Sequence, residues 1–340
     1  MTFAPSRGGS DELRRFRRLV KLTIAATFAL IVIGGVVRVS DSGLGCGPPG
    51  SGTHGWPLCD GQVVPFLEGS TLIEFSHRIA AGVVGVLIAL IAWRAFRDLR
   101  AQRWIVRGTV AAGVLVLAQA VLGGATVENN LDEVLVAAHL GLAMLLLATL
   151  IGLLRAASDP EKGALPAGTT RGLRAVAVVA SALVLATIVA GGLVAGTEEE
   201  GVRGSTVVNG AHMACGEEFP TCLDGVMPYG ISRLTDIHLT HRAFMYLATA
   251  AVVALFVLAR WRGVRTWPFA AALGVLALQV LLGALNVWLG EHAGLIVAHL
   301  TVGTVLWATL SYATASLVPV PTRATQRVDR RGPEEAAVPA

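Results

Sequence analysis

Residues 134–154 read VLVAAHLGLAMLLLATLIGLL, and this stretch decides the fold class because its only ionisable side chain is His139. An α-helix needs about twenty such residues to cross a bilayer. The chain is 54% hydrophobic and 15% charged, whereas soluble domains are about a quarter charged. The apolar stretches of this chain, of which residues 134–154 are one, are too long for the strands of a membrane barrel. We therefore expect an all-α integral membrane protein. Eight transmembrane helices are predicted, at roughly 20–37, 72–93, 108–127, 134–154, 175–196, 238–259, 268–289 and 295–316.

Basic residues are divided unevenly between the two sides of these helices. Of the 27 lysines and arginines, 22 fall in the two tails and in the loops on the same side as the tails. Because positive charge gathers on the cytoplasmic side of membrane proteins, both termini are predicted to be cytoplasmic. The tail segments 1–12 and 320–340 are expected to be disordered.

The two halves of the chain carry matching motifs. Gln119, Leu122 and Gly123 have the same offsets as Gln279, Leu282 and Gly283, and Gly34-Gly35 corresponds to Gly191-Gly192. Such repeats are common in membrane proteins and often place sites between or within the repeated units. We therefore predict two pseudo-symmetric four-helix bundles. The boundaries are a tail at 1–19, a bundle at 20–155, a linker at 156–173, a bundle at 174–317 and a tail at 318–340.

Four of the eight histidines lie inside predicted spans, at positions 77, 139, 241 and 299. Each falls shortly after the outer start of an even-numbered span, so His77 and His139 share one depth, as do His241 and His299. Two imidazoles facing each other across a bundle are what a six-coordinate haem iron requires. Interhelical hydrogen bonding is the alternative, and zinc is less favoured because no carboxylate or thiol accompanies the histidines in a compact ligand spacing. Three further histidines, His54, His212 and His292, lie in outer loops, where solvent exposure is expected.

Charged residues adjoin the first histidine of each pair. Arg78 follows His77 and Arg242 follows His241, and either arginine can pair with a haem propionate or extend to the membrane interface. Glu74 lies one helical turn before His77, whereas the corresponding residue of the second half is His238. Glu74 is a candidate for moving protons or positioning water, and the alternatives are a favourable helix N-terminal charge or a salt bridge to Arg78. This difference favours separate roles for the two halves, one reactive and one carrying electrons.

The four cysteines form two pairs in outer loops, Cys46 with Cys59 and Cys215 with Cys222. The outside of a cell is oxidising, so a disulfide within each loop is expected. Each disulfide either braces its loop or exchanges electrons with a substrate or donor. Bracing needs fewer assumptions.

The sequence resembles the haem A synthase family over most of its length, from about residue 22 to residue 317. The motifs that carry the resemblance are Gly34-Gly35-x-x-Arg38, Ser42-Gly43-Leu44-Gly45-Cys46, Trp56-Pro57-x-Cys59-x-Gly61 and Glu74-x-x-His77-Arg78, together with the four histidines within spans. The interval between Cys46 and Cys59 is longer than the family's compact version, with an insertion around residues 48–54.

The resemblance implies an oxidoreductase that converts the C8 methyl group of haem O into a formyl group by successive hydroxylations, with oxygen from water. It assigns a haem b to His241 and His299, the substrate haem O to His77 and His139, and an essential role to Glu74. It also implies that Cys46 and Cys59 take part in the reaction, whereas Cys215 and Cys222 form a bracing disulfide. The insertion leaves the catalytic role of Cys46 and Cys59 open.

The implied setting is a bacterial plasma membrane, with the cysteine loops outside. The expected partners are haem O, membrane lipid, a haem O synthase, components of cytochrome oxidase assembly and a quinone or other electron acceptor. A homo-oligomer is compatible with the sequence, and no nucleic-acid partner is expected. Two alternatives stay open: a di-haem b-type cytochrome that only transfers electrons, and a haem transporter or chaperone.

Overall fold

The computed structural model describes residues 7–158, 165–198, 200–203, 206–290 and 292–319. Eight helices in this part of the chain are long and apolar enough to cross a membrane, which confirms the predicted all-α membrane fold. Their bounds are Arg7–Val39 (α1), Gly69–Asp98 (α2), Arg103–Glu128 (α3), Glu133–Ala156 (α4), Arg171–Gly196 (α5), Arg233–Trp261 (α6), Trp267–Trp288 (α7) and Ala293–Ser316 (α8).

The first helix extends well beyond the predicted span of 20–37. α1 begins at Arg7 and continues through the basic segment, because arginine, leucine and glutamate are good helix formers. Residues 7–12 are therefore helical rather than disordered. The rest of the tails predicted to be disordered, residues 1–6 and 320–340, lies outside the described residues.

Local hydrogen bonds determine where several helices begin. The side chain of Asp132 accepts the backbone N–H groups of Val134 and Leu135 at the start of α4. Thr170 caps α5 and Ser232 caps α6 in the same way. Such caps satisfy backbone donors that have no partner within the helix.

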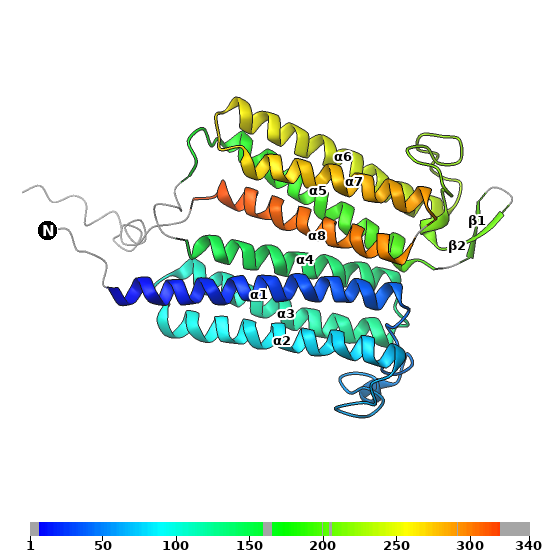
Figure 1. Cartoon of the computed structure of the whole chain (residues 1–340), viewed down its shortest axis with the longest axis horizontal. Helices are drawn as coiled ribbons and strands as arrows, with labels where there is room; N and C mark the ends of the chain where they lie inside the picture. Colours follow the sequence, from blue (N-terminus) through cyan, green and yellow to red (C-terminus); the bar gives the residue numbers. More distant parts are fainter. Residues whose placement is uncertain (1–6, 159–164, 199, 204–205, 291, 320–340) are drawn as a thin grey trace, which may run out of the picture.

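Each set of four consecutive helices closes into a bundle. In the first set, sequential helices contact each other and α1 also contacts α4; in the second, α5 likewise contacts α8. The two bundles lie side by side through contacts of α4 with α5 and α8, and of α1 with α8 (Figure 1). The start of α1 and the end of α8 lie at the same end of the molecule. The pseudo-symmetry of the two bundles stays a prediction.

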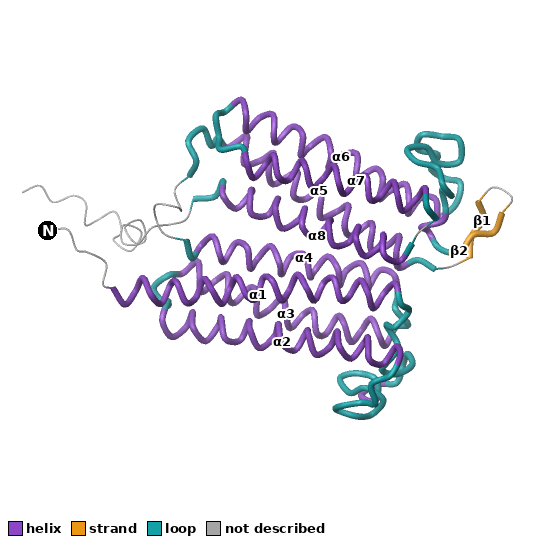
Figure 2. Tube along the Cα trace, in the orientation of Figure 1, coloured by secondary structure: helices purple, strands orange, loops and turns teal. Residues whose placement is uncertain are grey.

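Two long loops join the helices at the opposite end, which we call the disulfide end (Figure 2). Residues 40–68 link α1 to α2 and contain the 3₁₀ helix η1 (Gly52–His54). Residues 197–232 link α5 to α6 and contain a second 3₁₀ helix, η2 (Ala211–Met213), and a short antiparallel hairpin of β1 (Glu200–Arg203) and β2 (Thr206–Asn209). The sequence analysis did not predict this hairpin. The other end of the helices is called the basic end.

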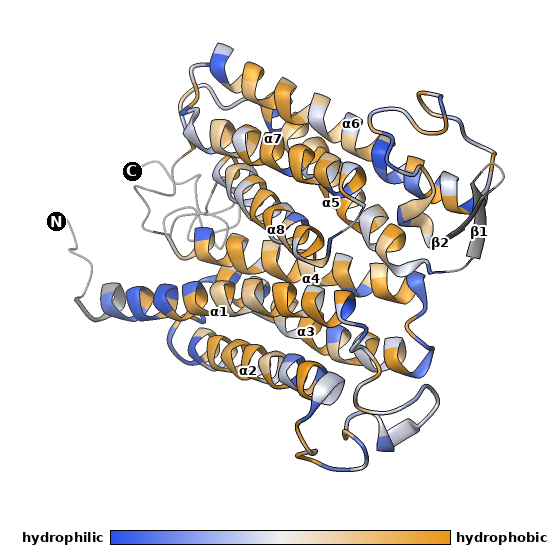
Figure 3. Ribbon diagram, turned by 45° about the vertical axis from the view of Figure 1, so that its right-hand side comes forward, coloured by the Kyte–Doolittle hydropathy of each residue, from blue (hydrophilic) through white to orange (hydrophobic). Residues whose placement is uncertain are grey.

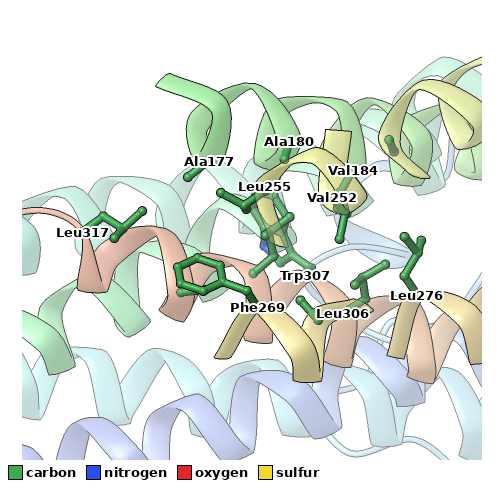
Figure 4. Close-up of a cluster of buried hydrophobic side chains, with 14 of the residues drawn as sticks. Ala177, Ala180, Val184, Val252, Leu255, Phe269, Leu276, Leu306, Trp307 and Leu317 are labelled. Carbon is green, nitrogen blue, oxygen red and sulfur yellow. The ribbon is translucent and has the colours of Figure 1, made fainter. Parts of the chain in front are cut away.

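Buried apolar residues fill the helix bundles. Phe269 of α7 and Trp307 of α8 belong to a large cluster that also includes Val184 of α5 and Val252 of α6 (Figure 4). A second cluster packs α1 to α4 around Phe16. The indole N–H of Trp307 donates to the backbone oxygen of Met144 at 2.7 Å, which ties α8 to α4 across the two bundles.

Apolar side chains also cover the outside of the helices. Val86, Val114, Leu117 and Val121 are each more than half exposed. Hydrophobic residues continue along all eight helices, with hydrophilic residues gathered near the ends and in the loops (Figure 3). An exposed apolar surface of this extent is expected for helices that face lipid.

Candidate functional site

The four histidines within helices lie at matched positions toward the disulfide end. His77 is the ninth residue of α2 and His241 the ninth of α6, counted from Gly69 and Arg233. His139 and His299 are the seventh residues of α4 and α8, counted from Glu133 and Ala293. At about 1.5 Å per residue, all four lie roughly two to three turns from a helix start.

The structure brings these histidines together within each bundle. His241 and His299 line one cavity in the second bundle, and His77 and His139 occupy the matching places on α2 and α4 of the first. No group of three or more His, Cys, Asp or Glu side chains suited to a metal ion occurs among the described residues. The arrangement is therefore two imidazole pairs, one in each bundle.

A cavity opens beside the second pair. It is lined by His241, His299, Arg242, Gln279, Gly283 and Phe219, together with apolar residues of α5 to α8. Pockets that bind cofactors are mostly apolar, with a few polar groups that fix orientation. Its lining therefore fits an apolar ligand held by imidazoles.

Hydrogen bonds orient the second histidine pair. Nδ1 of His241 lies 2.9 Å from the backbone oxygen of Thr187, and a proton on Nδ1 donates to that oxygen. This tautomer leaves Nε2 free to bind a metal. In metal-binding histidines, the ring nitrogen that does not bind the metal commonly donates its N–H to an acceptor such as a backbone oxygen. The side-chain amide of Gln279 donates to Nε2 of His299 at 3.1 Å.

The first histidine pair contains polar atoms without partners. Nδ1 of His77, Nδ1 of His139 and Oε1 of Gln119 are buried and have no hydrogen-bond partner within the described chain. Nδ1 of His299 is also buried and has no hydrogen-bond partner within the described chain. Buried polar atoms are normally satisfied, so these ring nitrogens are exceptions within the described residues.

Glu74 is only 4% exposed and links α2 to the first disulfide loop. Its Oε2 accepts the backbone N–H of Cys46 at 2.7 Å, and its Oε1 accepts Nε–H of Arg78 at 3.1 Å. Nη2 of Arg78 forms a closer ion pair with the same oxygen. The salt bridge considered in the sequence analysis is therefore present, and the carboxylate also holds the disulfide loop.

The residue at the corresponding place in the second bundle is arranged differently. His238 is buried, lines the cavity, and has Nδ1 3.0 Å from the backbone oxygen of Ala211. It thus contacts the second disulfide loop through a ring nitrogen, where Glu74 uses a carboxylate. The two halves differ in charge at this position.

The two arginines that follow the histidines hold the backbone of the disulfide loops. Nη1 of Arg78 donates to the backbone oxygens of Gly55 and Leu58, at 2.6 and 2.7 Å. In the second bundle, Arg242 donates from Nη1 to Thr221 at 2.7 Å and from Nη2 to Glu218 at 2.9 Å.

The sequence analysis missed this role of the arginines. In both loops the arginine donates to two backbone oxygens. One belongs to the residue directly before the second cysteine (Leu58 or Thr221), and the other to the residue directly before an aromatic-proline pair (Gly55 or Glu218). The repeated motifs Trp56-Pro57-x-Cys59 and Phe219-Pro220-x-Cys222 are the signal from which the contacts could have been inferred.

Both predicted disulfides are present, Cys46–Cys59 and Cys215–Cys222, and all four cysteines are buried. The longer first interval accommodates the insertion as an exposed turn that contains η1. The wide spacing is therefore compatible with a closed loop.

The loop histidines have different environments. His54 and His292 are exposed, as expected, and Nδ1 of His292 accepts the N–H of Gly294 at the start of α8. His212 is only partly exposed, so the expectation of solvent exposure was wrong for it. Burial lowers the pKa of His212 below 6.5, nearby Arg38 lowers it further, and Glu198 opposes the shift.

These features define a class of multi-pass membrane protein: two four-helix bundles, each with a histidine pair near a disulfide-closed loop. The chain belongs to the cytochrome oxidase assembly protein family, whose sequence profile matches residues 66–311.

Bacterial relatives support this membership over most of the chain. The chain is 26% identical over 307 residues to a protein of Alkalihalophilus pseudofirmus named heme A synthase. The aligned region covers 88% of this chain and 97% of the relative. It is 27% identical over 297 residues to a heme A synthase of Halalkalibacterium halodurans, which covers 86% and 93%. A heme A synthase of Shouchella clausii is 28% identical over 248 residues, which covers 71% and 75%.

Proposed function

We propose that this protein is a haem A synthase, an oxidoreductase that converts haem O to haem A for cytochrome oxidase. The observation that carries the proposal is a pair of similar histidine sites of which only one has a buried carboxylate beside it. Family membership and the names of the relatives support the same activity. One bundle then holds the substrate and the other holds a resident cofactor.

The resident cofactor is haem b, held by His241 and His299 in the bundle of residues 174–317. The cavity beside these rings and the hydrogen bond that orients His241 support this assignment. A bis-histidine haem accepts and donates single electrons, which is the chemistry it supplies when bound. Phe219 and apolar residues of α5 to α8 line this part of the bundle.

The substrate haem O is held by His77 and His139 in the bundle of residues 20–155. Two axial imidazoles leave no open iron position for molecular oxygen, so the oxygen of the new formyl group comes from water. Conversion of a methyl group and one water into a formyl group releases four electrons and four protons. A quinone or another acceptor in the membrane takes the electrons.

Glu74 is placed to handle protons during this conversion. Its carboxylate lies one turn before His77 and is shielded from bulk water, with Arg78 and the N–H of Cys46 as partners. A positioned carboxylate can take a proton from an attacking water. The disulfide Cys46–Cys59 is tied to this carboxylate and takes part in the reaction, whereas Cys215–Cys222 braces the second loop.

The disulfide end faces the outside of a bacterial plasma membrane, and both termini are cytoplasmic. The excess of arginine at the basic end and the two disulfides at the other support this orientation. Arg78 and Arg242 stand at the membrane edge of each site and bind propionates there, in exchange for some of their loop contacts. Haem O synthase and the assembly machinery of cytochrome oxidase are the expected partners.

The test is expression of the full chain together with a haem O synthase in a host that makes no haem A, followed by identification of the extracted haems. The proposal predicts haem A, and its absence from cells that contain folded protein would overturn the proposal. A protein that only transfers electrons would yield haem B and unchanged haem O. A transporter would yield haem O that exchanges with added haem and no product.

A further inference from the structure

Each of the four histidines packs against one glycine of the neighbouring helix in its bundle. Gly34 of α1 faces His77, Gly123 of α3 faces His139, Gly191 of α5 faces His241 and Gly283 of α7 faces His299. A methyl group at these glycines would lie 3.2, 3.2, 2.9 and 3.0 Å from Cε1 of the respective imidazole. Carbon atoms pack at about 3.5–4.0 Å. A methyl group at Gly191 would therefore force a shift, and at the other three glycines the ring would have to give by a few tenths of an ångström.

The contact is specific to one glycine on each helix. A methyl group at Gly35 would meet Leu300, and one at Gly124 would meet Trp56. At Gly113 of α3 and Gly274 of α7 it would meet nothing within 4 Å. The histidine contacts are therefore distinct from the general use of glycine for close helix packing.

The glycines also bear on which ring nitrogen is presented to the bundle. At Gly34, Gly191 and Gly283, the added carbon would lie closer to Nδ1 of the imidazole than to Nε2. Nε2 is thus the ring nitrogen farther from the glycine. This is the atom that the hydrogen bond from His241 to Thr187 leaves free.

We propose that Gly34, Gly123, Gly191 and Gly283 are positioning residues, four seats that fix the rotation of the imidazoles in their bundles, with Nε2 of His241 left facing the ligand. The inference rests on the proposed function, because it assigns the imidazoles to haem iron. The contacts are tighter in the second bundle, so alanine at Gly191 or Gly283 disturbs ligation more than alanine at Gly34 or Gly123.

The test uses the full chain purified with its bound haem, as the variants Gly191→Ala and Gly283→Ala. The expected result is an altered low-spin electron paramagnetic resonance signal and at least a twofold loss of haem from the second bundle. The matched control Gly274→Ala, on the same helix as Gly283, keeps the wild-type signal. Signals and haem content identical to wild type in both seat variants would overturn the inference.

A second measurement separates the seat from general helix packing. In a His241→Gly background, free imidazole replaces the missing side chain and is not tethered, so it can move away from a methyl group. The effect of Gly191→Ala on the low-spin signal should then disappear, as coupling in a double-mutant cycle requires. An undiminished effect in that background would show that Gly191 acts through helix packing and would overturn the inference.

The same experiments separate failure of this inference from failure of the proposed function. Wild-type protein that binds no haem would refute the proposed function. Wild-type protein that binds haem, with seat variants indistinguishable from it, would refute only the seats. If Gly191→Ala does not fold, Gly34→Ala replaces it in the test, because the contact at Gly34 is looser. Gly113→Ala, on the same helix, serves as the control for Gly123→Ala.

Discussion

The carboxylate of Glu74 accepts the backbone N–H of Cys46 at 2.7 Å, which joins the first disulfide to the helix turn that precedes His77. Along the chain, the insertion around residues 48–54 lies between Cys46 and Glu74. A buried carboxylate that receives a backbone N–H and an arginine is held in one orientation. The relationship connects the acid, the disulfide and the histidine of the first bundle in one short path.

Glu74→Gln is expected to lower haem A formation by about 100-fold or more, because an amide cannot accept a proton as a carboxylate does. Glutamine retains the size of the side chain and an oxygen for the N–H of Cys46, so the protein should still fold and bind haem. The measurement is the ratio of haem A to haem O in the co-expression assay. The control is Glu68→Gln at the exposed residue before α2. A normal haem A yield in Glu74→Gln would remove the acid from the mechanism.

The two disulfides are expected to respond differently to removal. Changing both Cys215 and Cys222 to serine should lower the free energy of unfolding by about 2–3 kcal/mol, as the closing of a short loop predicts. Haem A formed per molecule of folded protein should be retained. The same change at Cys46 and Cys59 should abolish haem A formation in protein that remains folded. Equal activity per folded molecule in the two double variants would show that the first disulfide also only braces its loop.

Arg242→Lys should destabilise the protein although the charge is kept. The guanidinium donates to Thr221 and Glu218 together, and a lysine ammonium cannot match that forked geometry. Loss of one buried hydrogen bond from a charged donor costs about 1.5–3 kcal/mol. Thermal unfolding in detergent measures the change, with Arg262→Lys at the exposed basic end as the control. An unfolding midpoint equal to that of wild type would contradict the loop-holding role.

The environment of His212 predicts a loss of stability in acid. Its pKa is lowered in the fold mainly by burial, so the unfolded chain binds a proton near pH 6.5 while the folded chain does not yet do so. Stability is therefore full above about pH 6.5 and falls as the pH drops below that value. His212→Gln should flatten the dependence of the unfolding midpoint between pH 7 and pH 5. Equal slopes for His212→Gln and wild type would contradict this account.

Much of the fold was predictable from the sequence because the membrane imposes a simple rule on helix length. All eight spans were located, and the repeated motifs paired His77 with His139 and His241 with His299. The disulfide pairs also followed from their loops. These features depend on spacing along the chain, which the sequence records directly.

The missing parts depend on how helices rotate and how loops fold back. The glycine repeat was visible, yet its contact with the imidazoles requires the rotation of each helix about its axis. The carbonyl groups that bind Arg78 and Arg242 carry no side-chain signal. Arg38 is a further example, since it donates to the backbone oxygen of Ala195 at 2.7 Å in the other half and pairs with Glu198.

One histidine pair in each bundle is proposed to hold a haem. Purified full-length protein should therefore show low-spin bis-histidine electron paramagnetic resonance signals from two haems when it is co-expressed with a haem O synthase. His241→Ala or His299→Ala should remove the haem B signal alone, and His77→Ala or His139→Ala the other signal alone, with exposed His54→Ala unchanged. Protein that folds with no low-spin haem signal, or signals unaffected by all four substitutions, would contradict the account.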